Sequence, residues 1–592
     1  MDLAAGFPAT TRDDWRALAL AVLRKSGVEA ASPEEALSGP TYDGVTLSPL
    51  YDADDLPAAP PFDRAAHAAR AAGGWDVRQR HAVPDPEAVL ADLENGVTSL
   101  WLAVGDGAIP VGELGRVLKG VHLDLAPITL DAGHRTAEAA EALLALAAER
   151  GTPARGNLGA GTAGGRDTAV RLARRCVAEF PGLRAVTVDA TPYHDAGGGD
   201  ADELGCSIAL GVACLRALTD AGLSVEEAFG QLEFRYAATD DQFATIAKLR
   251  AARRLWARIA ELCGVETGTP AAGASGVQLQ HVVTSSAMMT ARDPYVNMLR
   301  TTVACFAAGV GGADAVTAQP FDACLGPPDA FSRRIARNTQ ALLLEEAGVG
   351  RVADPAGGSW YVERRTADLA ERAWGWFQDI EAAGGIDPAA GLVARRVAAT
   401  RERRAADVAH RRFPITGVSE YPQPGEKPPR RPRRDGPWPA SSREGTPAGL
   451  PVIRYAQEFE ELRDVADALP ERPKVFLATI GPVAAHSARA AFAANLFHAG
   501  GLATETAGPG AEPDQIATAF AVSGTTVACL CSTDRLYARH AEAVAAALRK
   551  AGARLVWLAG QGSYDGVDAC LHTGCDALGV LRTTFDVLEV AR

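Results

Sequence analysis

The sequence has 592 residues, of which 47% are hydrophobic and 22% charged, a composition typical of globular proteins. Its net charge of −14 argues against general binding to nucleic acid, which needs a basic face. No apolar run approaches the ~20 residues of a membrane-spanning helix, and the N-terminus lacks the pattern of a signal peptide. We therefore expect a cytoplasmic protein that binds neither nucleic acid nor membrane. The ten cysteines form no C-x-x-C pair, so no metal site is expected.

Residues 1–80 are predicted to form an extended N-terminal arm with some helix near residues 12–26. Two strings in this segment, TYDGVTLSPLYDADDL and GGWDVRQRHAV, show neither helical nor strand periodicity.

Residues 81–400 alternate short apolar runs with Ala/Leu/Glu-rich helical stretches. The runs TSLWLAVG, GVHLDLAP and LRAVTVDAT are predicted strands, and TAEAAEALLALAAERG and TAVRLARRCVAEFPG are predicted helices. Such alternation is typical of βα units and a parallel sheet. About 300 residues of it favour a (β/α)8 TIM-type barrel over an open sheet.

Residues 401–470 are predicted to be a linker, because their Pro-, Arg- and Gly-rich centre cannot bury a core. Residues 471–592 return to the alternation on a smaller scale, which makes the whole chain an α/β protein. Five βα units in about 120 residues match the flavodoxin-like size class. The predicted strands are KVFLATI, LATETAG, TVACLCS, ARLVWLAG and CDALGVL, with helices at about 484–499, 512–523, 536–551 and 563–573 and a last one over TTFDVLEVAR.

Several long strings resemble the methylmalonyl-CoA mutase family across residues 41–592. They include TYDGVTLSPLYDADDL, GGWDVRQ, IAKLRAARRLWARI, ARDPYVNMLRTTVACFAAGVGGADAVTAQPFD, FSRRIARNTQALLLEE and VADPAGGSWYVE. The resemblance implies a TIM-type barrel followed by a flavodoxin-like, cobalamin-binding-type domain. It also implies adenosylcobalamin chemistry that interconverts methylmalonyl-CoA and succinyl-CoA in propionate metabolism. In the family, the acyl-CoA threads the barrel and the cofactor lies between the two domains.

The small domain departs from the family's cobalamin motif, D-x-H-x-x-G. Aligned on its flanking glycines, the motif places Val483 at the Asp, Ala485 at the His and Ala488 at the Gly. His486 stands one residue late and without its paired Asp, so a ligating histidine is not expected. The later cofactor elements are eroded as well, since Ser532 lacks its following Leu and one glycine of the Gly-Gly pair is Ala559. By the resemblance, this chain binds no cofactor and no metal.

The barrel departs from the family's substrate motif in a similar way. Leu279, Val283 and Ala287 replace its Arg, Gln and Trp, which removes the donors that would hold a thioester or phosphate. The remnants of that motif are His281, Thr284 and Ser285.

One pair of the family's reactive residues is retained, Tyr193-His194, which in the family lies beside the substrate carbonyl. A histidine there could act as a general acid. The segment that follows the pair is two residues shorter than in active chains, which favours a structural remnant.

The resemblance therefore implies a non-catalytic chain that pairs with a catalytic large subunit, which holds adenosylcobalamin. The complex would be an isomerase of the intramolecular transferase type. Two alternatives stay open: a self-sufficient mutase of altered specificity, and a mutase-derived binding or chaperone protein. We expect the arm, anchored by Tyr42 and Tyr51, the VADPAGGSWYVE loop and the linker to contact the partner. The alternative is that the arm packs on its own barrel.

Overall fold

The computed structural model describes residue 6 and residues 10–56, 74–161, 165–265, 276–432, 449–510 and 512–590. Parts of the predicted arm (57–73) and linker (433–448) lie outside the described residues. Within the described residues, no helix is both long enough and apolar enough to cross a membrane.

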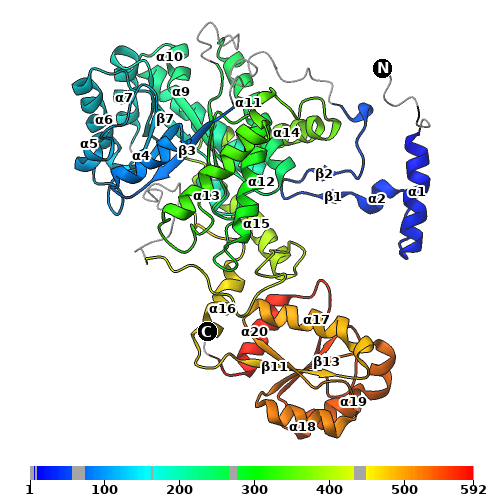
Figure 1. The fold of residues 1–592 in the computed structure, drawn as a ribbon. Helices are drawn as coiled ribbons and strands as arrows, with labels where there is room; N and C mark the ends of the chain where they lie inside the picture. The colour runs from blue at the N-terminus through cyan, green and yellow to red at the C-terminus, as the bar shows by residue number, and fades with distance from the viewer. Residues whose placement is uncertain are drawn as a thin grey trace.

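A closed barrel of eight parallel strands forms the larger body of the molecule (Figure 1). Neighbouring strands along the chain pair in order, and the last strand closes the barrel by pairing with the first, Ala315 opposite Asp76. This confirms the predicted TIM-type barrel. The strands are β3 (Asp76–His81), β4 (Ser99–Ala103), β5 (Ile128–Asp131), β6 (Gly156–Ala160), β7 (Leu183–Asp189), β8 (Leu232–Ala238), β9 (Gln280–Thr284) and β10 (Ala315–Thr317).

Helices surround the barrel and bury their apolar faces on it. In α6 (Thr136–Arg150), for example, the buried residues Ala139, Ala140, Leu143, Leu144 and Ala147 follow the helical period. The other long helices are α4 (Pro86–Glu94), α7 (Arg166–Glu179), α9 (Asp200–Asp220), α11 (Gln242–Leu262), α12 (Val296–Val310), α13 (Ala330–Ala341), α14 (Trp360–Ala382) and α15 (Ala390–Ala409).

Two of the barrel predictions are wrong. The barrel begins at Asp76, inside the predicted arm, where the DVRQRH segment forms β3. Polar side chains are buried on both faces of this strand, so its sequence lacks the alternation of polar and apolar residues that marks a strand. The string GVHLDLAP forms a turn, and the strand β5 follows it directly.

The family string VADPAGGSWYVE contributes to the barrel's own packing. Its Asp354 and Glu363 both pair with Arg250 of α11, the latter at 2.7 Å, and the Arg250 side chain is 1% exposed. These two carboxylates balance a buried guanidinium, whereas Val352 and Trp360 of the same string are exposed, so contact of the loop with a partner stays a prediction.

The arm has two differently placed parts. Its first part holds α1 (Arg12–Lys25) and α2 (Pro33–Leu37), and it projects away from the barrel (Figure 1). The helix predicted near residues 12–26 is confirmed, and no residue of α1 is buried. The second part runs through β1 (Gly39–Pro40), β2 (Thr46–Leu47) and η1 (Ala53–Asp55).

The second part of the arm lies on the chain's own helices. The Tyr42 hydroxyl donates to Asp407 at 2.8 Å, and the Tyr51 ring lies 5.1 Å from the Tyr361 ring. The alternative, packing on the own barrel, is therefore found for the partly buried Tyr42 and Tyr51 rings, and their contact with a partner stays a prediction.

The C-terminal domain is a sheet of five parallel strands in the order β12-β11-β13-β14-β15, with helices on both faces. This order is one of the two common doubly wound arrangements. The strands are β11 (Lys474–Thr479), β12 (Ala503–Thr506), β13 (Val527–Cys531), β14 (Leu555–Ala559) and β15 (Ala569–Leu571), and the helices are α16 (Gln457–Ala468), α17 (Val483–Ala499), α18 (Pro513–Ser523), α19 (Asp534–Lys550) and α20 (Ala577–Val587).

Three predictions in this half need correction. The linker predicted at 401–470 contains the end of α15 and all of α16, whose Phe459 is fully buried in the core of the small domain. The helix predicted at 563–573 is a loop followed by β15. The predicted strand CDALGVL begins α20 instead, because Asp576 caps that helix by accepting from the Gly579 amide.

The two domains contact each other along the segment before α16. The Tyr455 amide donates to the Ala287 carbonyl, and the Ile453 amide to the Asp195 carbonyl, both at 2.9 Å. Arg292 adds an ion pair to Asp467 at 2.7 Å. The carboxyl ends of the barrel strands thus face the segment that leads into the small domain.

Candidate functional site

The structure brings together residues from the two barrel motifs at the carboxyl ends of the strands, where TIM barrels place their active sites. Tyr193 and His194 lie in α8 (Thr191–Asp195), directly after β7, and Ser285 directly follows β9. The His194 Nε2 lies 2.6 Å from the Ser285 hydroxyl. Both side chains are buried, and this bond engages one of the two ring nitrogens of His194.

A buried ionic network lies behind His194. The Lys248 ammonium is fully buried and contacts Glu203 at 2.7 Å and Asp200 at 3.0 Å. Burial alone would lower the pKa of Lys248, but Asp200 and Glu203 together raise it. Burial, with Lys248 and Arg404 nearby, lowers the pKa of His194 to about 3. His194 is therefore neutral at physiological pH.

The remnants His281 and Thr284 serve internal contacts. The Arg235 Nε donates to His281 Nδ1 at 3.2 Å, and His281 Nε2 lies 2.8 Å from the Thr317 hydroxyl. Burial, followed by Arg78 and Arg235, holds the pKa of His281 well below its ordinary value. The Thr284 hydroxyl accepts from the Gln319 amide at 2.8 Å. Neither side chain is free for a substrate.

The axis of the barrel is filled by side chains from opposite strands. Trp101 comes from β4, and Arg235 comes from β8, four strands further round the barrel. The guanidinium of Arg235 lies 4.4 Å from the centre of the Trp101 ring, and that of Arg80 lies 4.9 Å from it. The His281 ring meets the same indole edge-on at 5.3 Å. At this layer, side chains from opposite strands contact one another across the inside of the barrel.

Ion pairs balance the cations inside the barrel. Arg78 contacts Glu233 at 2.5 Å, and Arg235 contacts Asp189 at 2.9 Å. Burying these charges is costly unless they are paired, and here each arginine has a carboxylate partner. The sequence interpretation missed Trp101 and Arg235. The alternating arginines of DVRQRH were the available signal of a polar interior.

A cavity of about 630 Å³ opens beside His194. The arm residues Tyr42 and Asp43 form one wall, the start of α9 a second, and the end of α15 a third. Asp43 accepts a hydrogen bond from the Ala201 amide at 2.8 Å at the start of α9. Burial raises the pKa of Asp43 to about 7, and the nearby Asp200 adds to this rise. The arm is thus attached to the start of α9, and its residues Tyr42 and Asp43 line the cavity beside His194.

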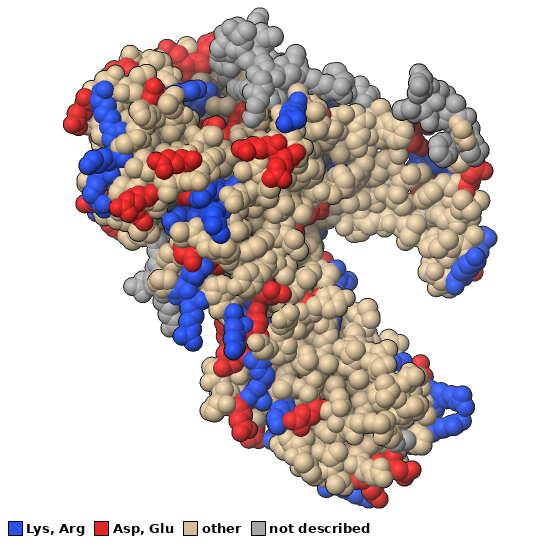
Figure 2. Space-filling model, viewed as in Figure 1, with Lys and Arg blue, Asp and Glu red and all other residues tan. Residues whose placement is uncertain are grey.

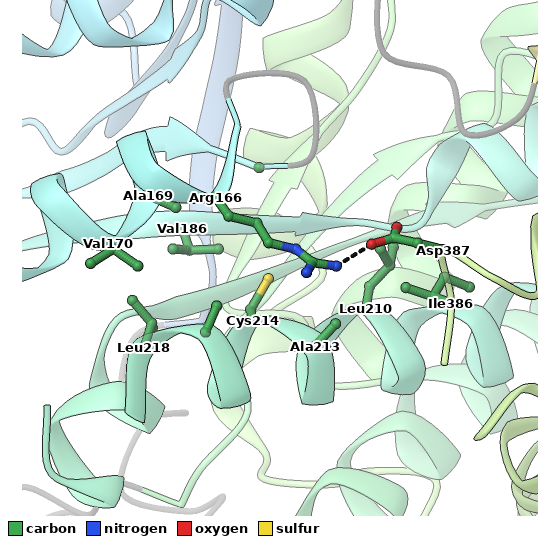
Figure 3. Close-up of a pocket in the computed structure, with 12 residues that line it drawn as sticks. Arg166, Ala169, Val170, Val186, Leu210, Ala213, Cys214, Leu218, Ile386 and Asp387 are labelled. Carbon is green, nitrogen blue, oxygen red and sulfur yellow. Dashed lines mark hydrogen bonds and ion pairs between the residues drawn. The ribbon is translucent and has the colours of Figure 1, made fainter. Parts of the chain in front are cut away.

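A second, smaller cavity of about 110 Å³ lies between α7 and α9 and is lined mainly by aliphatic side chains (Figure 3). An ion pair between Arg166 and Asp387 closes one side of it, and Cys214 lies in its wall. Burial raises the pKa of the Cys214 thiol to about 11, which leaves it protonated and unreactive.

The positions of the cofactor motif lie at the start of α17 in the small domain. Val483 begins this helix and is 59% exposed, while Ala485 and Ala488 present methyl groups. His486 is buried on the same helix, without the aspartate that would orient it. Among the described residues, no cluster of three or more His, Cys, Asp or Glu is arranged to hold a metal ion. The residues present do not fit a histidine-ligated cobalamin.

The fold and site define a two-domain α/β protein, a TIM-type barrel whose interior side chains meet across the axis, followed by a doubly wound domain. A family model described as methylmalonyl-CoA mutase matches residues 110–492. The chain is 54% identical over 623 aligned residues to the methylmalonyl-CoA mutase small subunit of Streptomyces virginiae, covering 100% of this chain and 99% of that protein. This chain therefore belongs to the methylmalonyl-CoA mutase family.

Two further relatives are similar along most of their length. The Mycobacterium tuberculosis (strain ATCC 25618 / H37Rv) protein named "Probable methylmalonyl-CoA mutase small subunit" is 44% identical, over 93% of this chain and 92% of that protein. The methylmalonyl-CoA mutase small subunit of Propionibacterium freudenreichii subsp. shermanii is 38% identical, over 100% of this chain and 97% of that protein.

Proposed function

We propose that this chain is the non-catalytic small subunit of a heterodimeric methylmalonyl-CoA mutase. The observation that carries the proposal is the filled barrel axis, where Trp101 and Arg235 meet from opposite strands. In the family the acyl-CoA threads the barrel, and in this chain these two side chains would lie across its path. The relatives named as small subunits support the same role.

The chemistry then belongs to a partner, the catalytic large subunit, which holds adenosylcobalamin and interconverts methylmalonyl-CoA and succinyl-CoA. The C-terminal domain of this chain is a flavodoxin-like, cobalamin-binding-type domain that has lost its motif at Val483, Ala485 and Ala488. The complex is an isomerase of the cytoplasm, and this chain contributes structure to it. The neutral, hydrogen-bonded His194 gives no support to a self-sufficient mutase.

The first part of the arm is the segment we assign to partner contact. Leu18 is 70% exposed and Val22 is 62% exposed on α1, which buries none of its residues in this chain. Such apolar side chains gain stability only against another surface. On the face drawn in Figure 2, the hollow between this arm and the small domain carries few charged side chains, whereas charges of both signs are scattered elsewhere.

Co-expression with a motif-intact large subunit tests the proposal. The full-length chain should co-purify with that subunit, and only the complex should turn over methylmalonyl-CoA. A variant that begins at residue 39 lacks α1 and α2 and should bind the large subunit more weakly. The matched control, Leu125→Ser, alters a side chain that is 72% exposed on the barrel and should bind normally.

Two results would contradict the proposal. Turnover by the single chain, shown to be free of large subunit by mass spectrometry, would assign catalysis to this chain. A base-off cobalamin spectrum that disappears in His486→Ala would show that a shifted histidine ligates the cofactor.

A further inference from the structure

The C-terminal sheet has a crevice position where doubly wound domains bind their ligands. Such domains place ligands beyond the carboxyl ends of the strands, where the strand order reverses. In the order β12-β11-β13-β14-β15, the reversal lies between β11 and β13. In this chain, side chains of the domain itself occupy that position.

Polar contacts join the two strands across the reversal point. The Ser532 hydroxyl, just after β13, donates to the Ile480 carbonyl, just after β11, at 2.8 Å. The Tyr537 hydroxyl accepts from the Ser532 amide at 2.8 Å. The same hydroxyl lies 3.0 Å from the Leu530 carbonyl and 2.8 Å from the Ala559 carbonyl, so it links the ends of β13 and β14. Tyr537 is 1% exposed, and its phenol fills this edge from within.

Arg489 covers the same edge from α17. Its Nη1 donates to the Ser532 carbonyl at 2.7 Å and its Nη2 to Asp534 at 2.6 Å. The guanidinium also lies 5.2 Å from the centre of the Tyr537 ring. Gly560 makes room for it: a Cβ there would lie 2.8 Å from the guanidinium carbon, and the φ of +131° disfavours other residues. The glycine next to Ala559 therefore accommodates an arginine of the same chain.

We propose that Arg489 and Tyr537 form an internal latch that takes the position of a ligand and fixes α17 on the sheet. Ligands stabilise the folded state that binds them, and a domain without one needs another source of that stability. The latch supplies it with charge-assisted hydrogen bonds inside the chain. Both residues lie outside the positions of the cofactor motif, and the latch forms without a partner.

The helix that the latch fixes also contacts the segment that joins the two domains. Asn495 of α17 accepts from the Tyr421 amide at 2.9 Å and donates to Glu420 at 2.8 Å. The same segment is held on the barrel by Arg300, which donates to the Thr416 carbonyl at 2.7 Å. Holding α17 in place therefore holds the segment that connects barrel and small domain.

Hydrogen–deuterium exchange of the full chain tests the latch. Arg489→Met keeps the aliphatic stem and removes the charged group. We expect amide exchange in residues 480–489 and 416–421 to become faster by roughly tenfold or more, as for the loss of a charge-assisted hydrogen bond. Tyr537→Phe, which keeps the ring, should accelerate exchange at residues 530–533. The matched control is Arg535→Met, an exposed arginine of α19 that should leave exchange unchanged.

Exchange in Arg489→Met within twofold of the parent chain would overturn the proposal. So would a uniform acceleration across both faces of the small domain, because that would indicate general destabilisation. If Arg489→Met does not fold, Tyr537→Phe decides, and unchanged exchange at residues 530–533 in that variant would refute the latch.

Discussion

Replacing His194 by alanine tests whether the retained Tyr-His pair still takes part in chemistry. A general acid or base typically contributes about 10²–10⁴-fold to the rate. With its pKa lowered to about 3, mainly by burial, His194 is neutral at pH 7. Its Nε2 is engaged with Ser285 at 2.6 Å. We therefore expect turnover of the assembled complex to stay within about twofold of the parent value.

The same change should cost stability. It removes one of two partners of the buried Ser285 hydroxyl, which also accepts from the Met288 amide at 3.2 Å. Losing this hydrogen bond costs about 0.5–1.5 kcal/mol, and the lost ring adds a cavity term. The measurements are the steady-state rate of the purified complex with methylmalonyl-CoA and the denaturant midpoint of the isolated chain. Ser285→Ala removes the same bond from the other side and serves as the control. A rate loss of 100-fold or more in the intact heterodimer would refute the remnant interpretation and indicate a second working site.

Two further predictions concern the arm and the barrel axis. Burial, followed by Asp200, raises the pKa of Asp43 in the folded chain to about 7, so the folded state favours the protonated carboxyl. The stability that this preference contributes is present below about pH 4 and is lost as the pH rises through 7. Asp43→Asn should make the attachment of the arm less dependent on pH between 5 and 8, as measured by amide hydrogen exchange at residues 39–47. An exchange rate that depends on pH as steeply as in the parent chain, after correction for intrinsic exchange, would contradict this. Trp101→Ala should lower the free energy of unfolding by about 3–5 kcal/mol in urea titration, and a loss below about 1 kcal/mol would show that the indole does not fill the axis.

The fold could be predicted where the hydrophobic period is simple. The apolar strand β4 and the amphipathic helix α6 both follow directly from their patterns. The first barrel strand could not, because its Arg78, Gln79, Arg80 and His81 are all buried and mimic an exposed segment. In the small domain, the three-residue strand β15 is too short for a period to be detected. The following segment CDALGVL is helical, and the cap at Asp576 is the local signal that distinguishes helix from strand there.

The losses at Ala485 and Leu279 stay predictions from residue type, because a methyl group cannot ligate cobalt and an aliphatic side chain cannot bind an anion. The side-chain contacts that the structure places in these regions could not be predicted. The contacts of Trp101 with Arg235, and of Arg489 with Tyr537, join residues distant in sequence. The register of the barrel strands brings the first pair together, and the position of α17 on the sheet brings the second pair together. No local sequence pattern predicts either contact.

The filled axis also explains why such a barrel would not readily regain a passage. Arg78 and Glu233 are both less than 10% exposed, and Arg235 shares its layer with Trp101 and pairs with Asp189. Removing one member of a buried ion pair typically costs about 3–5 kcal/mol, because the other charge stays desolvated. A single substitution that clears space therefore leaves an unpaired charge in the core. Clearing the axis without that cost requires paired changes on both strands of each ion pair, such as β3 and β8 for Arg78 and Glu233.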